Sequence, residues 1–181
     1  MPPTRVSMIA GATGEWRIER ILAIRGDPLP VAERLRRVEG KPGSPPEGRW
    51  ILHGVRSHER YTTHAEKVQL TSASPELGRP GMHACLIPIR KSAAWWALAQ
   101  DERRALFEER SRHIGIGLEY LPAVARRLYH CRDLGEPFDF LTWFEFAPND
   151  AGLFDELLRR LRQIEEWSYV EREVEVRLSQ A

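Results

Sequence analysis

Hydrophobic and polar residues alternate along several segments of the chain, as they do in β-strands that bury one face. The clearest segment is 138–146, where Thr142 and four phenylalanines occupy every second position. Successive side chains of a strand point to opposite faces, so this period of two predicts a strand. By the same pattern we expect strands at 16–25, 82–89 and 170–178, and one long strand or a bent pair at 50–63.

The segment 170–178 separates its apolar and charged residues by face. The residues expected to face the core are Val170, Val174, Val176 and Leu178, and those expected to face outward are Glu171, Glu173, Glu175 and Arg177.

Helical spacing of apolar residues is clearest after Asp150, which can cap a helix at its N-terminus. These apolar positions are Leu153, Phe154, Leu157, Leu158, Leu161 and Ile164. Weaker signals predict helices at 31–38, at 93–99 after Ser92, at 101–112 after Asp101, and from Pro122 to about residue 130. We expect little structure in residues 1–14 and loops at 40–48 and 71–81.

The order of these segments favours an α+β fold. Strands and helices are interspersed, but the strands alternate in polarity instead of being apolar throughout. Alternation is typical of antiparallel sheets with helices packed on one face, whereas the strands of a doubly wound parallel sheet are buried on both faces. The final strand–helix–strand unit looks like half of a ferredoxin-type module. With 181 residues, the chain can form one domain or two small ones that share a core.

Composition narrows the class of protein. The 27 basic and 26 acidic side chains nearly cancel to a net charge of +1, so no uniform field attracts polyanions, which argues against nucleic acid as a partner. No apolar stretch approaches the roughly 20 residues of a membrane helix, and no secretory signal is visible. We therefore expect a cytoplasmic protein with no membrane partner. Cys85 and Cys131 form no CxxC pattern, and free buried thiols are the commoner outcome for such residues.

The common catalytic motifs are absent from the sequence. None of the six histidines forms HExxH or a zinc-binding Cys/His spacing, and there is no GxSxG, P-loop or GxGxxG sequence. For an enzyme, this absence favours a metal or an organic cofactor. One candidate ligand is His113, which lies between a charged run at 101–112 and an apolar, glycine-bearing stretch. The alternative is a histidine that only stabilises a helix end.

Arg126 follows His113 by thirteen residues. On one unbroken helix this spacing corresponds to roughly 19.5 Å, too far for both side chains to meet over one metal ion. Pro122 and two preceding glycines predict a break, which would let the chain turn and bring both residues to opposite faces of a flat cofactor. Alternatively, Arg126 and Arg127 form an ordinary solvated pair.

Two further places carry candidate chemistry. Glu166 follows the apolar helix and could accept the outer N–H of a ligand histidine, which would make the imidazole a stronger donor. The alternative is an ordinary surface glutamate. Trp95 and Trp96 follow Lys91 by about one helical turn and could form the wall of a cofactor pocket, with the lysine as a cation for cofactor carboxylates. Tandem tryptophans also occur in cores and at subunit interfaces.

Several stretches resemble the chlorite dismutase-like family of haem proteins. The most specific is YLPAVARRLYHCRDLG at 120–135, followed by PFDFLTWFEF at 137–146. Glu166-Trp167-x-Tyr169-Val170 and Arg172-Glu-Val-x-x-Arg177-Leu178 also match. The resemblance is strong from about residue 91 to the end, and upstream it rests mainly on Arg60-Tyr61-Thr62-Thr63.

This resemblance implies two ferredoxin-like modules whose sheets form an open barrel, a dimeric α+β barrel architecture. The module at 1–90 would be truncated, and the module at 91–181 would bind haem b. The short chain is similar to the dimeric branch of the family, which implies a homodimer.

The resemblance also assigns roles to individual residues. His113 matches the proximal iron ligand, Glu166 the carboxylate paired with it, and Arg126 the distal catalytic arginine. The remaining matches are Leu128, Thr142 and Phe144 in the lining of the distal pocket, and Tyr61, Lys91 and Trp95 around the haem propionates.

A distal arginine is typical of the members that convert chlorite to chloride and dioxygen, whereas relatives that decarboxylate coproheme place other residues there. The resemblance thus implies a haem-dependent chlorite dismutase with chlorite as its small anionic substrate. Two alternatives remain: a peroxidase-like or coproheme-processing member of the family, and a haem-free ferredoxin-like dimer that binds small ligands.

Overall fold

The computed structural model describes residues 4–41, 46–56, 61–73 and 75–181. Within them, eight strands form a closed barrel in the order β1-β3-β2-β8-β5-β7-β6-β4, and every pairing is antiparallel. The strands are β1 (Thr4–Gly11), β2 (Trp16–Arg25), β3 (Arg34–Glu39), β4 (Trp50–Arg56), β5 (His83–Lys91), β6 (Val124–His130), β7 (Phe140–Phe146) and β8 (Val170–Gln180).

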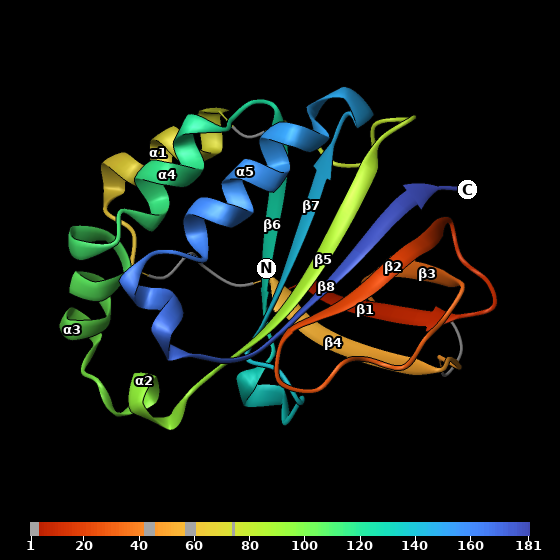
Figure 1. Cartoon of the computed structure of the whole chain (residues 1–181), viewed down its shortest axis with the longest axis horizontal. Coiled ribbons are helices and arrows are strands. Elements are labelled where there is room, and N and C mark those ends of the chain that lie inside the picture. The colour runs from red at the N-terminus through yellow and green to blue at the C-terminus, as the bar shows by residue number, and fades with distance from the viewer. Residues whose placement is uncertain (1–3, 42–45, 57–60, 74) are drawn as a thin grey trace.

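Most of the helices gather on one side of the molecule, over the half of the barrel built from β5 to β8 (Figure 1). They are α1 (His64–Ala73), α2 (Ala93–Ala97), α3 (Gln100–Arg104), the π-helical η1 (Ala105–Arg110), α4 (His113–Glu119), α5 (Ala151–Leu161) and the 3-10 helices η2 (Arg132–Leu134), η3 (Pro148–Asp150) and η4 (Glu165–Tyr169). In the described part of the chain no helix covers the outer face of β1 to β4 (Figure 1). This arrangement confirms the expected α+β class with antiparallel strands.

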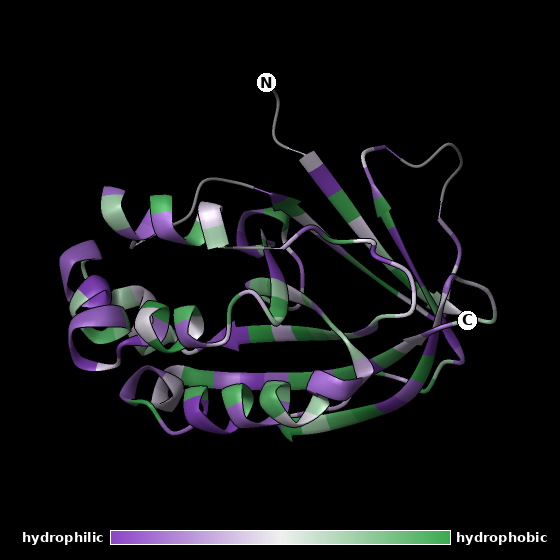
Figure 2. Ribbon diagram, turned by 90° about the horizontal axis from the view of Figure 1, so that it is seen from above, coloured by the Kyte–Doolittle hydropathy of each residue, from purple (hydrophilic) through white to green (hydrophobic). Residues whose placement is uncertain are grey.

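Two apolar cores follow from the alternation along the strands (Figure 2). One fills the barrel, where the rings of Trp16 and Trp143 meet edge to face at 5.3 Å. The other lies between the sheet and the helices, where Phe146 stacks on Phe154 of α5 at 4.4 Å. Because both faces are covered along the middle of β5 to β8, polar side chains such as Glu145 and Glu173 are shielded from water there.

Most of the patterned segments have the structure that their sequence predicts. The segment 16–25 is β2, 82–89 corresponds to β5, 138–146 to β7 and 170–178 to β8. The helix after Asp150 is α5, and its buried residues are Phe154, Leu157, Leu158 and Leu161. Ser92 and Asp150 stand at the expected N-cap positions, although neither side chain makes a capping hydrogen bond.

Three segments expected to be helical or weakly structured are strands instead. Residues 4–11 form β1, 34–39 form β3, which overlaps the predicted helix 31–38, and 124–130 form β6 where a helix was expected after Pro122. β1 and β6 pair with strands on both sides, and β3 pairs with β1 and β2. Hydrogen bonding to two neighbours and burial of one face outweigh a weak local helix preference.

The region 50–81 differs from its prediction at its centre. β4 ends at Arg56, and residues 57–60 lie outside the described residues, so the predicted strand to residue 63 is borne out only in its first half. Residues 64–73 form α1, a helix that was not predicted, and its last three residues fall in the segment 71–81 that was expected to be a loop. Only Leu70 of α1 is buried, so the helix leaves no clear apolar stripe in the sequence.

The last strand has the polar face that its sequence predicts, but part of that face is not exposed to solvent. Glu173 and Glu175 do point away from the barrel, but they are 0% and 3% exposed beneath the helix layer. Arg162 at the end of α5 contacts both carboxylates. Which face of a strand is polar can be predicted locally, whereas what covers that face depends on the rest of the fold.

Both cysteines are free and buried, as expected. In the described residues no helix is long and apolar enough to cross a membrane.

Candidate functional site

His113 is the first residue of α4, immediately after a left-handed residue. Arg112 has φ of 54°, which separates η1 from α4 and redirects the chain. Glu108 of η1 caps the new helix, since its carboxylate accepts hydrogen bonds from the backbone N–H groups of Ile114 (2.6 Å) and Gly115 (3.2 Å). The break between the preceding helix and His113 therefore lies at Arg112. The predicted break between His113 and Arg126 is confirmed, because α4 ends at Glu119 and a turn that contains Pro122 leads into β6.

A buried carboxylate fixes the imidazole of His113. Glu166 lies on η4 and is 3% exposed, and its Oε2 is 2.7 Å from His113 Nδ1. An ionised carboxylate only accepts hydrogen bonds, so Nδ1 carries the proton and donates it. In neutral imidazole the other nitrogen, Nε2, then presents a lone pair, which is the form that binds a metal. The pair therefore holds the imidazole in an orientation and tautomer that could bind a metal ion through Nε2.

Lys91 completes this cluster from β5. Its Nζ donates to Glu166 Oε1 at 2.6 Å and lies 4.2 Å from the centre of the Trp95 ring. Burial alone raises the pKa of Glu166, but the attraction of His113 and Lys91 and their hydrogen bonds lower it to about 2. Burial lowers the pKa of Lys91, and the Glu166 carboxylate opposes that shift. The carboxylate is thus held ionised in an interior position.

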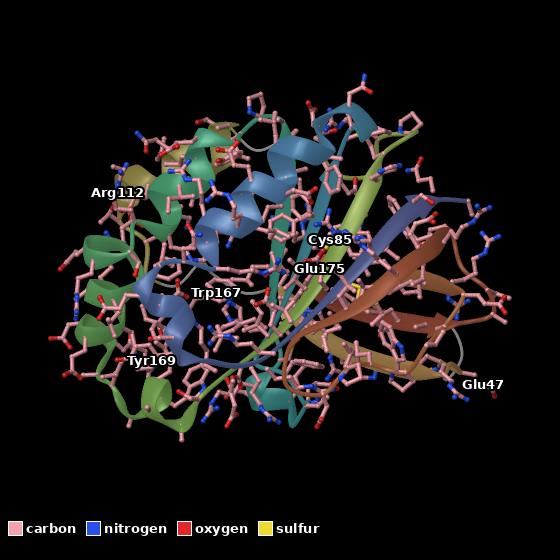
Figure 3. The ribbon with its side chains drawn as sticks, in the orientation of Figure 1. Glu47, Cys85, Arg112, Trp167, Tyr169 and Glu175 are labelled. Atoms are coloured by element: carbon pink, nitrogen blue, oxygen red, sulfur yellow. The ribbon has the colours of Figure 1, made fainter. Side chains whose placement is uncertain are left out.

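Aromatic rings surround His113. Phe107 of η1 stacks on the imidazole, with ring centres 4.4 Å apart and planes at 24°. Trp167, next to Glu166, lies nearly parallel to the imidazole at 6.1 Å and 29°. Tyr61 contacts both Phe107 (5.8 Å) and Trp95 (6.2 Å). Figure 3 places Trp167 and Tyr169 on η4, on the helix-covered side of the sheet.

The indole nitrogen of Trp95 lacks a hydrogen-bond acceptor. Its side chain is 1% exposed, and its Nε1 is the one buried side-chain nitrogen or oxygen atom of the described residues that has no hydrogen-bond partner. A buried donor without an acceptor costs roughly 1–3 kcal/mol. An acceptor supplied by a bound group, such as a carboxylate, would remove that cost.

Arg126 and three other predicted site residues share the helix-facing side of the sheet. In the register of β6 and β7, Arg126 pairs with Phe144, and Leu128 pairs with Thr142. Phe144 belongs to the core between sheet and helices, together with Ile116 of α4 and Tyr120, which follows α4 directly. The structure therefore brings Arg126, Leu128, Thr142 and Phe144 to the sheet face that α4, which starts with His113, covers. Arg126 lies on a strand, not on the predicted helix.

The other predicted residues lie elsewhere around the cluster. Tyr61, half-buried with φ of 62°, precedes α1, and its backbone oxygen and hydroxyl accept hydrogen bonds from Arg104 and Arg103. Lys91 is 6% exposed and hydrogen-bonded to Glu166, so its ammonium group forms an ion pair with a buried carboxylate.

Sequence reasoning missed several residues that shape the site. Phe107 gives no signal because it lies in a charged run. Ser111, whose hydroxyl accepts the N–H of Glu166 at 3.2 Å, gives none because nothing in the sequence pairs it with η4. Two surface hollows, one along α1 and one beside β1 and β3, include none of the predicted site residues. Side-chain chemistry, not the shape of the surface, defines the candidate site.

The structure is thus an antiparallel α+β barrel whose helix layer contains a histidine held by a buried carboxylate, an arrangement that could hold a metal or a cofactor. A sequence model of the chlorite dismutase family matches residues 31–181. The chain belongs to this family.

Two solved structures and one related protein sequence agree with the assignment. A dimeric chlorite dismutase from Nitrobacter winogradskyi is 52% identical and has a TM-score of 0.91, over 97% of this chain and 99% of that one. A chlorite dismutase from Candidatus Nitrospira defluvii, studied as a mutant with cyanide, is 24% identical with a TM-score of 0.71, which supports the fold. A chlorite dismutase from Ideonella dechloratans is 37% identical over 86 residues, 48% of this chain but only 28% of that relative's length.

Proposed function

We propose that this protein is a haem b-dependent chlorite dismutase, which converts chlorite to chloride and dioxygen. The observation that carries the proposal is the pair His113–Glu166, which leaves Nε2 of a fixed imidazole as a ligand on the helix side of the sheet. The same sheet face bears Arg126, the cation that this reaction needs for an anionic substrate. Family membership and the similarity to named chlorite dismutases support this assignment.

The residues present fit haem. His113 would ligate the iron, and the aromatic rings around it offer flat apolar surfaces to a porphyrin. The unpartnered Nε1 of Trp95 suits a haem propionate, and the ring of Tyr61 packs against the Trp95 ring at 6.2 Å. Lys91 was expected to contact a propionate as well. Its hydrogen bond to Glu166 leads us to propose instead that it acts on the proximal side, by holding that carboxylate.

The protein's own groups have separate roles in the proposed reaction. Haem, when bound, supplies the redox chemistry of iron. Glu166 keeps the proton on Nδ1 of His113 and strengthens the imidazole as an electron donor. Arg126 attracts the chlorite anion and retains anionic fragments, in a pocket whose other proposed walls, Leu128, Thr142 and Phe144, exclude water. A charge interaction in such a pocket is stronger than in water.

We also propose the organisation expected from the family resemblance. The order of β5 to β8, with helices between β5 and β6 and between β7 and β8, supports a ferredoxin-like haem-binding module. β1 to β4 would form the truncated module. Because β5 lies between β8 and β7, the boundary is better placed before His83 than at residue 90. The dimeric relative supports a homodimer. A cytoplasmic location stays a prediction.

Haem titration with three variants tests the proposal. The purified protein should bind haem with a strong Soret band, and His113→Ala should weaken that binding sharply. Arg126→Ala should retain haem and lose oxygen evolution from chlorite by roughly a hundredfold, because it removes a charge-stabilising group. Arg127→Ala is the matched control, since Arg127 points to the opposite face of β6 and bonds to Glu39. Unchanged haem binding by His113→Ala, or full oxygen evolution by Arg126→Ala, would refute the respective assignment.

A further inference from the structure

Glu173 and Glu175 are neighbouring buried carboxylates on β8, and they have one partner in common. Arg162 donates to Glu173 Oε1 through Nε at 2.9 Å and to Glu175 Oε2 through a terminal nitrogen at 2.7 Å. Arg177 adds a second guanidinium to Glu175. Figure 3 shows Glu175 at the middle of the sheet, on the strand that lies beneath the helix layer. Both glutamates therefore tie the end of α5 to β8.

The two glutamates differ in one contact. The second oxygen of Glu173 accepts the indole N–H of Trp167 at 2.8 Å, and both groups are buried. Glu175 has Arg162 and Arg177 as its close partners instead. The ion pairs of Glu175 are explained by their contribution to anchoring α5. The hydrogen bond between Glu173 and Trp167 involves no residue of α5, so anchoring of this helix does not explain it.

Trp167 packs against the cluster formed by His113, Glu166 and Lys91. It follows Glu166 directly in the chain, its ring is nearly parallel to the His113 imidazole, and Lys91 Nζ lies 5.7 Å from its ring centre. Arg25 of β2 donates to its backbone oxygen at 2.9 Å, so backbone and indole are both held. A rotation of this side chain would change the packing of all three members of the His113–Glu166–Lys91 cluster.

We propose that Glu173 is a positioning residue of the candidate haem site, because it holds the Trp167 indole and thereby fixes Glu166 against His113. This inference rests on the proposed function, in which His113 ligates the iron. Loss of the indole hydrogen bond would loosen the Glu166–His113 contact, weaken imidazole as a donor, and raise the midpoint potential of the bound iron. Groups that support a metal ligand from outside typically change metal affinity by about 10- to 100-fold when replaced.

Three variants separate positioning from anchoring. Glu173→Gln removes the charge at Trp167 and at Arg162, whereas Glu175→Gln removes an equally buried charge from the same Arg162 without touching Trp167. Trp167→Phe removes the indole N–H and leaves Arg162 unchanged. We expect Glu173→Gln and Trp167→Phe to weaken haem binding to the apoprotein by about tenfold and to raise the midpoint potential. Glu175→Gln should lower thermal stability while leaving both properties close to those of the unaltered protein.

A double variant decides whether the effect passes through Trp167. In the Trp167→Phe background, Glu173→Gln should add little further change in midpoint potential. Equal shifts for Glu173→Gln and Glu175→Gln, or full additivity in the double variant, would overturn the inference. If Glu173→Gln does not fold, an unchanged potential in Trp167→Phe overturns it as well. Failure of the proposed function is a separate result, in which the unaltered protein does not bind haem or His113→Ala binds it normally.

Discussion

Glu166 is nearly excluded from solvent, yet it stays ionised because two nitrogen atoms, Lys91 Nζ and His113 Nδ1, lie within 2.7 Å of its oxygens. Removing one partner of a buried ion pair leaves an uncompensated charge and costs roughly 3–5 kcal/mol. At the scale of the residue, this carboxylate links the stability of the fold to the chemistry of the site.

The stability of the protein in acid depends on the ionised carboxylate of Glu166. The pKa of Glu166 is lowered from 4.5 to about 2, so its contribution to stability is complete above pH 4.5 and is lost as the pH falls toward 2. We expect Glu166→Gln to destabilise the protein by roughly 3–5 kcal/mol at pH 7, and by less at pH 3. Urea unfolding at both values measures the difference.

A double variant serves as the control for this prediction. Lys91→Met combined with Glu166→Gln removes the stranded ammonium, so it should recover part of the stability lost in the single variant. If the double variant is less stable than Glu166→Gln, the buried pair is not the origin of the effect.

At the scale of the element, the start of α4 determines where His113 points. Arg112 in the left-handed region ends the preceding helix, and Glu108 satisfies two of the backbone N–H groups that a helix N-terminus leaves open. α4 extends only from residue 113 to 119, so little other hydrogen bonding holds its first turn.

Glu108→Ala should therefore destabilise the protein by about 1 kcal/mol, the usual cost of a lost N-terminal cap. It should also weaken haem binding, because the first turn of α4 carries His113. Thermal unfolding and haem titration measure the two effects. Glu109→Ala, one residue later and exposed, is the control and should change neither. Equal behaviour of the two variants would exclude capping as the cause.

At the scale of the whole molecule, the barrel is closed where β4 meets β6, a contact that we call the seam. A single register pair, Val55 and His130, joins these strands. Gly54 faces Tyr129 across the seam, and a Cβ at position 54 would lie 2.7 Å from Tyr129 Cβ. Neither atom can move without its backbone, so glycine is what allows the strands to approach.

Gly54→Ala should force the seam open and destabilise the protein by roughly 1–3 kcal/mol, as overpacking does. Gly152→Ala in α5 is the matched control, because nothing lies within 4 Å of its added Cβ. That control should be neutral or more stable by up to about 1 kcal/mol, since alanine favours helices. Calorimetric unfolding compares them, and a normal midpoint for Gly54→Ala would contradict the tight seam.

The sequence by itself determined those features that depend on local periodicity. Alternation predicted β2, β5, β7 and β8, helical spacing predicted α5, and the antiparallel α+β class followed from both. Family resemblance in the second half singles out His113, Arg126 and Glu166 from the sequence alone.

Only the tertiary structure decided which strands pair and which partner each charged residue contacts. β3 and β6 are strands because partners on both sides pair with them, which no local pattern records. Glu173 belongs to a polar strand face in the sequence, but α5 and η4 cover that face, so its carboxylate is buried and holds Trp167. Lys91 likewise meets Glu166, 75 residues away. Periodicity is a property of neighbouring residues, whereas burial and charge pairing depend on segments that only the fold brings together.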